Sequence, residues 1–128
     1  MIKKTLSLLA LAAVLAGCAA PATITNLTAS QQPRNATGVY TIEAQWDTNQ
    51  QTVKGDTLRP AIIVGNEFIP MRRVRKTSNR WEADVPVPAD KDYLLYRFRF
   101  DYDYARFGPA GAGSRTTGDF RLSITDGK

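Results

Sequence analysis

The chain has 128 residues, with 17 Lys and Arg against 12 Asp and Glu, no histidine and a single cysteine. Its length indicates one domain. The lack of histidine and the lone cysteine exclude nearly every Ser-His, Cys-His and zinc arrangement. We therefore expect a protein without catalytic activity and without a cofactor or metal.

The N-terminus has the charged and apolar regions of a secretory signal peptide. Lys3 and Lys4 supply positive charge, and residues 6–15 form an apolar run built on Leu and Ala. This run is too short to span a hydrocarbon core that needs roughly 20 residues. We therefore expect residues 1–17 to be a signal peptide rather than a transmembrane helix.

The residues at the end of this segment, Leu15-Ala16-Gly17-Cys18, resemble the lipobox of bacterial lipoproteins. The resemblance implies cleavage before Cys18, a diacylglyceryl group on its sulfur and acylation of its new amine. In Gram-negative members of that family, an aspartate after the cysteine is associated with inner-membrane retention. Ala19 therefore implies the outer membrane and leaves the side of that membrane open. The alternative is an ordinary secretory signal followed by an unmodified cysteine.

Residues 18–22 give the domain only a short tether. Ala19 to Ala22 reach no more than roughly 14 Å at about 3.5 Å per residue. The domain at residues 23–128 would then lie close to its membrane, which suits a subunit of a membrane-attached assembly. Cleavage also removes two lysines, so 15 basic residues remain against 12 acidic ones, a net charge of +3.

Downstream of the tether, the hydrophobic pattern has a period of two, which indicates half-buried β-strands. Residues 23–29 form the first expected strand, and residues 31–35 form a polar turn region. In the second expected strand, apolar and polar side chains alternate strictly. Its expected inward face comprises Tyr40, Ile42, Ala44 and Trp46.

Two hairpins and a final strand are expected next. Residues 61–64 and 67–69 flank Gly65-Asn66, a pair that suits a two-residue turn, and Pro70 should end that strand or place it at an edge. Residues 71–76 lead into a turn and return as a strand with inward Trp81, Ala83, Val85 and Val87. The last strand has Phe120, Leu122 and Ile124 on one face.

About seven short antiparallel strands favour an all-β sandwich, with a small closed barrel as the alternative. The plan resembles the immunoglobulin or fibronectin type III family over residues 23–126, and Asp90-Lys91-Asp92-Tyr93 is similar to the tyrosine corner of such domains. An inward Tyr93 would place Arg97 and Arg99 in the core, where unpaired guanidiniums are too costly. Either a bulge reverses the strand, or the opposite face is the core. We prefer the second interpretation, with an inward face of Leu94, Tyr96, Phe98 and Phe100.

Residues 94–104 alternate between apolar or aromatic and charged side chains. This length exceeds the usual strand of five or six residues, so the far end is expected to project past the sandwich. We expect Tyr102 and Tyr104, with Arg106 and Phe107, to form an aromatic platform for a protein partner. The same residues suit stacking on a sugar. The alternative is that the rings build core.

Residues 71–80 carry five positive charges and no acid. If they form a hairpin tip, they create a local positive electrostatic potential that the modest net charge of the domain does not reveal. Suitable partners are phosphorylated lipid headgroups, anionic glycans or an acidic protein, and the alternative is a solvated edge hairpin that discourages aggregation. Nucleic acid is not expected, because no recognition helix or RNA-binding aromatic motif is present. The charged residues are Arg72, Arg73, Arg75, Lys76 and Arg80.

Residues 107–118 are the longest stretch of low structural propensity. No Gly-Lys-Ser or Gly-Lys-Thr follows, and a strand comes next, so this is not a phosphate loop. We expect a mobile connector, with an ordered binding loop as the alternative.

The acidic residues provide a further test for catalysis and metal binding. Asp101 and Asp103 would lie roughly 7 Å apart on one strand face, within the range of glycosidase carboxylates. Arginines on the same face favour ionised, paired aspartates over a catalytic acid. Calcium at these positions, or at Asp90 and Asp92, lacks a loop motif.

These expectations combine into one hypothesis. The chain is expected to be a lipid-anchored, Ig-like β-sandwich that acts as a noncatalytic protein-interaction subunit of an outer-membrane assembly, with the tyrosine end and the basic hairpin as contacts. A surface glycan-binding lipoprotein is the second hypothesis. An inhibitor of a lytic or proteolytic enzyme, with residues 107–118 inserted into the cleft, is a more distant third.

Overall fold

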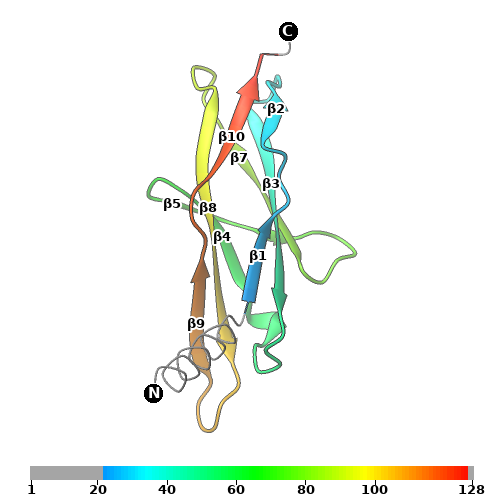
Figure 1. The fold of residues 1–128 in the computed structure, drawn as a ribbon, viewed down its shortest axis with the longest axis vertical. Coiled ribbons are helices and arrows are strands. Elements are labelled where there is room, and N and C mark those ends of the chain that lie inside the picture. Colours follow the sequence, from blue (N-terminus) through cyan, green and yellow to red (C-terminus); the bar gives the residue numbers. More distant parts are fainter. Residues whose placement is uncertain (1–21, 127–128) are drawn as a thin grey trace, which may run out of the picture.

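Two β-sheets pack face to face in the computed structural model, which describes residues 22–126. The molecule is elongated, with most strands running close to its long axis (Figure 1). The expected all-β, Ig-like sandwich is confirmed. The expected signal peptide and Cys18 lie outside the described residues.

The first sheet has four strands in the order β1-β3-β7-β6. Its central strands alternate as the sequence predicts, since Tyr40, Ile42, Ala44 and Trp46 are buried on β3 and Trp81, Ala83 and Val85 are buried on β7. The strands span Ala22–Asn26 (β1), Val39–Thr48 (β3), Arg72–Arg73 (β6) and Arg80–Pro86 (β7).

The second sheet has six strands in the order β2-β10-β8-β4-β5, with β9 also paired to β8. The neighbours along this path are antiparallel except β2 and β10, which are parallel. The strands span Gln31–Pro33 (β2), Arg59–Val64 (β4), Glu67–Pro70 (β5), Tyr93–Tyr104 (β8), Gly111–Thr116 (β9) and Phe120–Thr125 (β10). A short 3-10 turn, η1, covers Gly55–Thr57.

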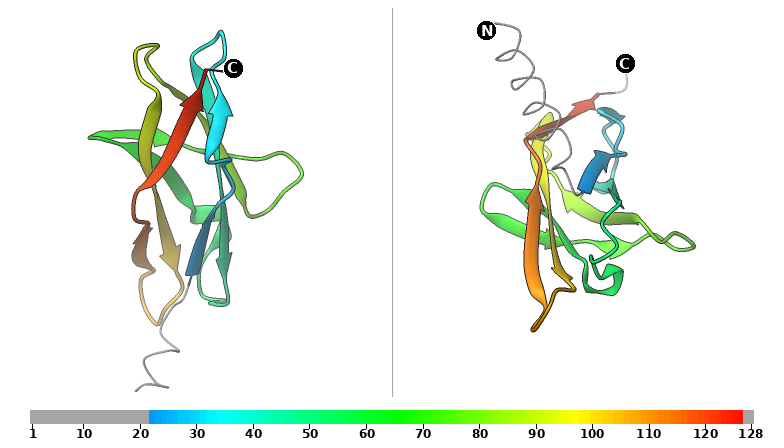
Figure 2. Two further views of the ribbon diagram at one scale, coloured as in Figure 1. Left: turned by 45° about the horizontal axis from the view of Figure 1, so that its top comes forward. Right: turned by 60° about the horizontal axis from the view of Figure 1, so that its bottom comes forward.

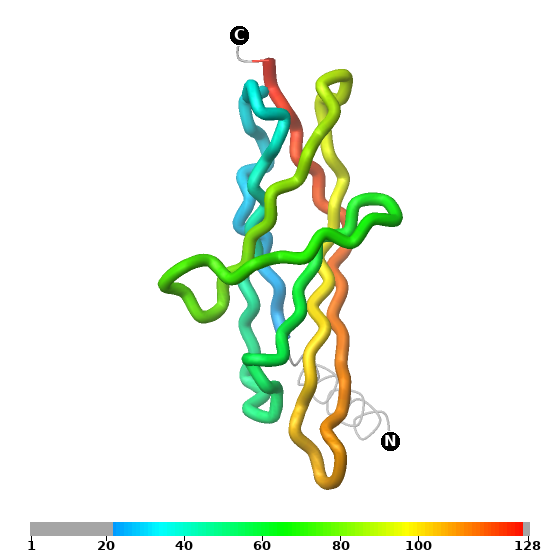
Figure 3. The backbone as a smooth tube through the Cα atoms, turned by 180° about the vertical axis from the view of Figure 1, so that it is seen from behind, coloured from blue at the N-terminus to red at the C-terminus, as the bar shows by residue number. Residues whose placement is uncertain are grey.

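The chain crosses from one sheet to the other between β5 and β6. The expected two-residue turn at Gly65-Asn66 is confirmed, and Gly65 adopts the positive φ of 58° that the turn needs. From this turn the chain runs straight across the body, so the 65–66 turn and the 74–79 turn project to opposite sides (Figures 2 and 3). Met71 marks the crossing, and its amide donates to the Pro60 carbonyl at 3.0 Å.

Aromatic side chains dominate the core between the sheets. Trp46 stacks on Phe100 with 5.1 Å between ring centroids, and Tyr96 meets Phe98 edge to face at 5.6 Å. Such pairs add roughly 0.5–1.5 kcal/mol beyond the burial of their surface. The inward face expected for β8 is therefore confirmed, while Tyr93 lies on the outside and is no corner tyrosine.

Two strands were not expected from the sequence. The polar segment expected as a turn contains β2, which runs parallel to β10. The glycine-rich segment expected as a mobile connector contains β9, which forms a hairpin with the far end of β8. The expectation of a mobile connector is wrong for residues 111–116, because they are paired along their whole length.

β9 and β10 are two halves of one strand along β8, interrupted at residues 117–119. Phe100 pairs with Arg115 on one side of the interruption, and Tyr96 pairs with Phe120 on the other. The two partners on β8 are therefore four residues apart in sequence, whereas Arg115 and Phe120 are five residues apart. The extra residue is a β-bulge. Because of it, odd-numbered residues face inward on β9 and even-numbered residues face inward on β10.

Candidate interaction surfaces

The tyrosine end of β8 lies within the sandwich rather than beyond it. Tyr102 is 7% exposed, and its ring centroid lies 5.4 Å from that of Trp46. Tyr104 is half-buried and packs against the same core. The expectation that these two rings project is therefore wrong, because β3 and β9 extend alongside the end of β8 and cover it.

Two glycines explain how the tyrosine rings are accommodated. Gly113 pairs with Tyr102 and Gly111 with Tyr104, on the inner face of the hairpin. A Cβ on Gly113 would lie 2.6 Å from the Tyr102 ring, and one on Gly111 would clash with the Tyr104 ring. The rings lie across the glycines, in the place of the missing side chains. This segment is rich in glycine because the strand opposite carries tyrosine.

The other two residues of the expected platform lie beyond β8. Phe107 is fully exposed. The Arg106 side chain is held by the turn itself, since its Nε donates to the Pro109 carbonyl at 2.9 Å. Of the four expected platform residues, only Phe107 offers a free apolar side chain.

The two aspartates on the outer face of β8 are ion-paired. Asp101 lies 3.1 Å from Arg99, and Asp103 lies 3.4 Å from Arg59. Burial alone raises the pKa of Asp101, but hydrogen bonds from Ser114 and Arg99 and the charges of Arg99 and Arg59 outweigh it and hold this pKa below its usual value. The expectation of an ionised, paired carboxylate is confirmed for Asp101. Across residues 22–126, no three acidic or sulfur side chains come together as metal ligands.

The basic hairpin of β6 and β7 neutralises part of its own charge. Arg72 lies 3.4 Å from both Glu82 and Asp84, and Arg80 lies 3.9 Å from Glu43. Glu82 and Asp84 belong to the return strand β7, just beyond the basic run 71–80, and Glu43 comes from β3.

The remaining cations of the hairpin divide into two kinds. The Arg73 guanidinium stacks 4.6 Å from the Trp81 ring centre. Arg75 and Lys76 are exposed in the 74–79 turn and make no ion pair with any residue that the structure describes. Of the five expected contact residues, Arg73, Arg75 and Lys76 thus have no acidic partner among residues 22–126, and Trp81 covers the charge of Arg73.

An apolar patch that the sequence analysis did not single out lies on the outer face of the second sheet. Phe68 is 57% exposed, Leu95 48% and Tyr93 37%. Ile63 faces the same way, is buried, pairs with Phe68 and lines a hollow together with Leu95. Leu95 lies between two hollows of about 250 and 360 Å³. We call these four residues the outer patch.

Arginines surround the outer patch. The Arg121 guanidinium lies 4.4 Å from the Tyr93 ring centre, and that of Arg99 lies 6.0 Å from the centre of Phe68. Arg97 lines the smaller hollow beside Leu95 and forms no salt bridge with the described residues. The surface therefore combines exposed aromatic rings and a leucine with guanidinium groups, and aromatic side chains and arginine are enriched at protein interfaces.

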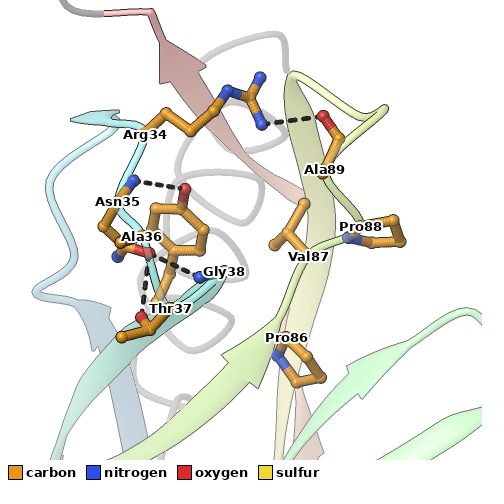
Figure 4. A pocket seen from close by; sticks show the side chains of 10 residues that line it. Arg34, Asn35, Ala36, Thr37, Gly38, Pro86, Val87, Pro88 and Ala89 are labelled. Atoms are coloured by element: carbon orange, nitrogen blue, oxygen red, sulfur yellow. Dashed lines mark hydrogen bonds between the residues drawn. The ribbon is translucent and has the colours of Figure 1, made fainter.

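A cleft of about 520 Å³ lies between residues 34–38 and 86–89, at the end of the molecule remote from β9 (Figure 1). The Arg34 side chain reaches across it and donates to the Ala89 carbonyl at 3.2 Å (Figure 4). Its Nε also pairs with Asp126 at 2.8 Å. The guanidinium of Arg34 is therefore already paired, and its bonds connect the two loops that form the cleft. We assign the cleft a structural role.

No family model, curated protein or solved structure matches this chain. The described residues also contain no helix that is long and apolar enough to cross a bilayer.

The outer patch had a visible signal in the sequence. Tyr93 and Leu95 belong to the face of β8 that otherwise carries charge, so two apolar residues at the start of that face mark a place where it is not simply solvated. Phe68 lies in the short return strand of a hairpin, and its outward direction follows only from the register of β5 against β4.

Proposed function

We propose that this chain is a lipid-anchored lipoprotein of the outer membrane and acts as a noncatalytic protein-interaction subunit of an envelope assembly. The anchor rests on the lipobox residues and on Cys18. The interaction role rests on the outer patch, because three of the five large hydrophobic side chains that are exposed in residues 22–126 lie there. Monomeric proteins seldom leave such groups clustered in water without a use.

The partner that fits this surface is a protein with an apolar patch rimmed by acidic side chains. Phe68, Leu95 and Tyr93 provide central apolar contacts, which carry most of the binding energy in many interfaces. Arg97 and Arg121 lie at the edge and complement acidic groups, which favours fast association and the correct partner. The unpaired Arg75 and Lys76 extend the same positive charge along another side of the molecule.

The glycan alternative loses part of its support. Tyr102 lies across Gly113 with its ring in the core, and Arg121 covers Tyr93. Stacking on a sugar needs an open ring face. Phe107 retains one, but a single exposed ring at a turn is a weaker platform than the outer patch.

The interaction role is tested by crosslinking in intact cell envelopes. A photoreactive residue replaces Leu95 in one version of the chain and Val39 in another; Val39 is similarly exposed, on the opposite sheet. We expect a specific crosslinked protein from position 95 and none from position 39. A Phe68→Ser, Leu95→Ser double variant should bind that protein at least about tenfold more weakly, since two central contacts are lost.

The matched control for the double variant is Val39→Ser, which removes an exposed apolar side chain away from the patch. Circular dichroism checks that both variants fold. An unchanged set of copurifying proteins with the folded double variant would contradict the proposed surface, and binding of purified envelope glycans instead would favour the glycan alternative.

The lipid anchor is tested separately. Cys18→Ser should abolish the incorporation of labelled fatty acid and move the protein from the membrane fraction to the soluble fraction. A wild-type chain that takes up no label would contradict lipidation, whatever the outcome for the outer patch.

A further inference from the structure

The strand β9 has one edge without a partner. It pairs with β8 on one side, and the structure of residues 22–126 places no strand on the other. β10, the other half of the same strand, is covered by β2 over residues 123–125. The edge is therefore occupied along one half and open along the other, next to the bulge (Figure 1).

The open edge presents a row of free backbone groups. The amide of Thr117 donates to the Phe98 carbonyl at 2.9 Å, so the hydrogen-bonded pairs of this ladder involve the odd-numbered residues of β9. In an antiparallel ladder, the alternate residues direct both N–H and C=O to the opposite side. These are Ala112, Ser114 and Thr116, which are all exposed.

Natural sheets usually protect an open edge by shortness, proline or charge. Three other edge strands have such devices, since β2 has three residues and ends at Pro33, β5 ends at Pro70, and β6 consists of two arginines. β9 has six residues and no proline. Its one charge, Arg115, faces inward and donates to the Ala22 carbonyl on β1 at 3.0 Å.

The space beside the open edge is not filled by the other sheet. β1 lies across from β9, and a groove of about 280 Å³ separates them. Its lining comprises Ala22, Thr23, Ile24, Arg115, Thr116 and Thr117. An additional strand can therefore approach β9 without displacing β1.

We propose that β9 pairs antiparallel with β9 of a second copy of this chain, centred on Ser114. In this register Ala112 faces Thr116 of the other copy, and Ser114 faces its counterpart. All three outward residues of each chain are then paired, which gives roughly six backbone hydrogen bonds.

The side chains on β9 fit this self-pairing. Arg115 lies opposite Gly113 of the other copy, so the two like charges do not face each other. The same-face pairs on the outside involve small residues only. Like charges directly opposite each other would destabilise the pair, and this register avoids them.

The geometry of the pair also suits a common membrane, a point that rests on the lipid anchor proposed above. The two-fold axis of an antiparallel pair stands perpendicular to the sheet, so the first sheets of both copies lie on the same side. Ala22, where β1 begins, is bonded to Arg115, one residue from the axis. Both tethers therefore start near the axis and on the same side.

Cysteine crosslinking of the lipidated chain in native envelopes tests the register. In the proposed pair, the Cα atoms of the two Ser114 residues are about 5.5 Å apart, within disulfide range. Two Ala112 residues are roughly 14 Å apart and cannot be joined. On addition of an oxidant, Ser114→Cys should give a disulfide-linked dimer, whereas Ala112→Cys alone and the wild-type chain should not.

A mixture of two variants provides a second test with different side chains. Chains carrying Ala112→Cys and Thr116→Cys, coexpressed with distinguishable tags, should crosslink with each other but not with their own kind. This result would support the register even if Ser114→Cys failed to fold. Equal crosslinking of Ala112→Cys with itself, or no crosslink from the folded single variant and from the mixture, would overturn the proposal.

A proline substitution tests the backbone contacts. Ser114→Pro removes an outward amide and leaves the amides that bond to β8 in place, so it should convert the dimer in detergent to a monomer by analytical ultracentrifugation. Ser114→Ala keeps the amide and should remain dimeric. A wild-type chain that sediments as a monomer at all concentrations examined would also overturn the proposal.

Discussion

The two halves of the strand beside β8 solve the same packing problem in opposite ways. β10 places Leu122 and Ile124 between the sheets, where both are buried. β9 places glycines at the equivalent positions and lets the tyrosines of β8 fill the space. The comparison teaches that a strand without large side chains can belong to a well-packed region, provided that its neighbour supplies the volume.

The largest effect is expected where the packing volume comes from the strand itself. Leu122 is completely buried, so Leu122→Ala removes apolar contacts and leaves a cavity. We expect a loss of about 2–5 kcal/mol in the free energy of unfolding. Urea unfolding followed by the fluorescence of Trp46 and Trp81 measures it. Ser123→Ala on the outer face is the control, and a loss as small as that of the control would contradict the assigned packing.

A smaller effect is expected where the neighbour supplies the volume. A Cβ at Gly113 would lie 2.6 Å from the Tyr102 ring, so Gly113→Ala forces that ring to move. We expect a loss of about 1–3 kcal/mol, measured in the same way. Ala112→Ser, on the outer face of β9, should change the stability by no more than about 0.5 kcal/mol.

A double-mutant cycle sharpens the interpretation of this loss. In the Tyr102→Ala background the ring is absent, so Gly113→Ala should cost much less than in the wild type. Equal losses in the two backgrounds would show that the glycine is needed for its backbone freedom rather than for the ring.

The smallest effect concerns the charge on the outside of the same hairpin. The pKa of Asp101 is lowered in the folded state, so the unfolded chain binds a proton more readily and the stabilisation is present above the ordinary pKa of 3.8. It is lost as the pH falls through the lowered pKa. Asp101→Asn should therefore be less stable than wild type by about 0.5 kcal/mol or less at pH 7.

The measurement for Asp101 is the difference in unfolding free energy between the two proteins as a function of pH. The difference should be constant above pH 6, narrow near pH 4 and close at lower pH. A difference that widens on acidification would mean that the carboxyl group is stabilised in its protonated form.

Most of the sandwich could be predicted because its central strands carry large side chains at every second position. Tyr40 to Trp46 on β3 and Leu94 to Phe100 on β8 mark their inward faces directly. The hairpin of β4 and β5 was also visible, since Gly65-Asn66 and Pro70 fix its turn and the end of β5. In these regions local preference and burial point to the same structure.

The remainder depends on contacts that no local pattern contains. Glycine contributes no hydrophobic signal, so Gly111 and Gly113 indicated a loop, although their spacing matches that of Tyr102 and Tyr104. The parity of inward residues also changes at the bulge, which breaks the period of two over residues 111–125. The prediction that Tyr102 and Tyr104 project was wrong for the same reason, because β9, which covers them, was not recognised as a strand.

The candidate contact surfaces could be predicted only in part, because they also depend on residues from neighbouring strands. The sequence identified the cations of the basic hairpin but not the acids on β3 and β7 that pair with them. The outer patch brings Phe68 and Leu95 together through β4, which lies between their strands. Such proximity follows from the order of strands in the sheet and not from the distance along the chain.

The bulge at residues 117–119 also bears on how the length of this chain can vary during evolution. It holds one residue more than the ladder with β8 requires. Removal of that residue would turn β9 and β10 into one regular strand and keep Arg115 and Phe120 opposite their present partners. A deletion within β9 or β10 would instead exchange the inward and outward side chains over part of the strand. Among descendants of this sequence, single-residue deletions are therefore expected to survive at the bulge and to be eliminated on either side of it.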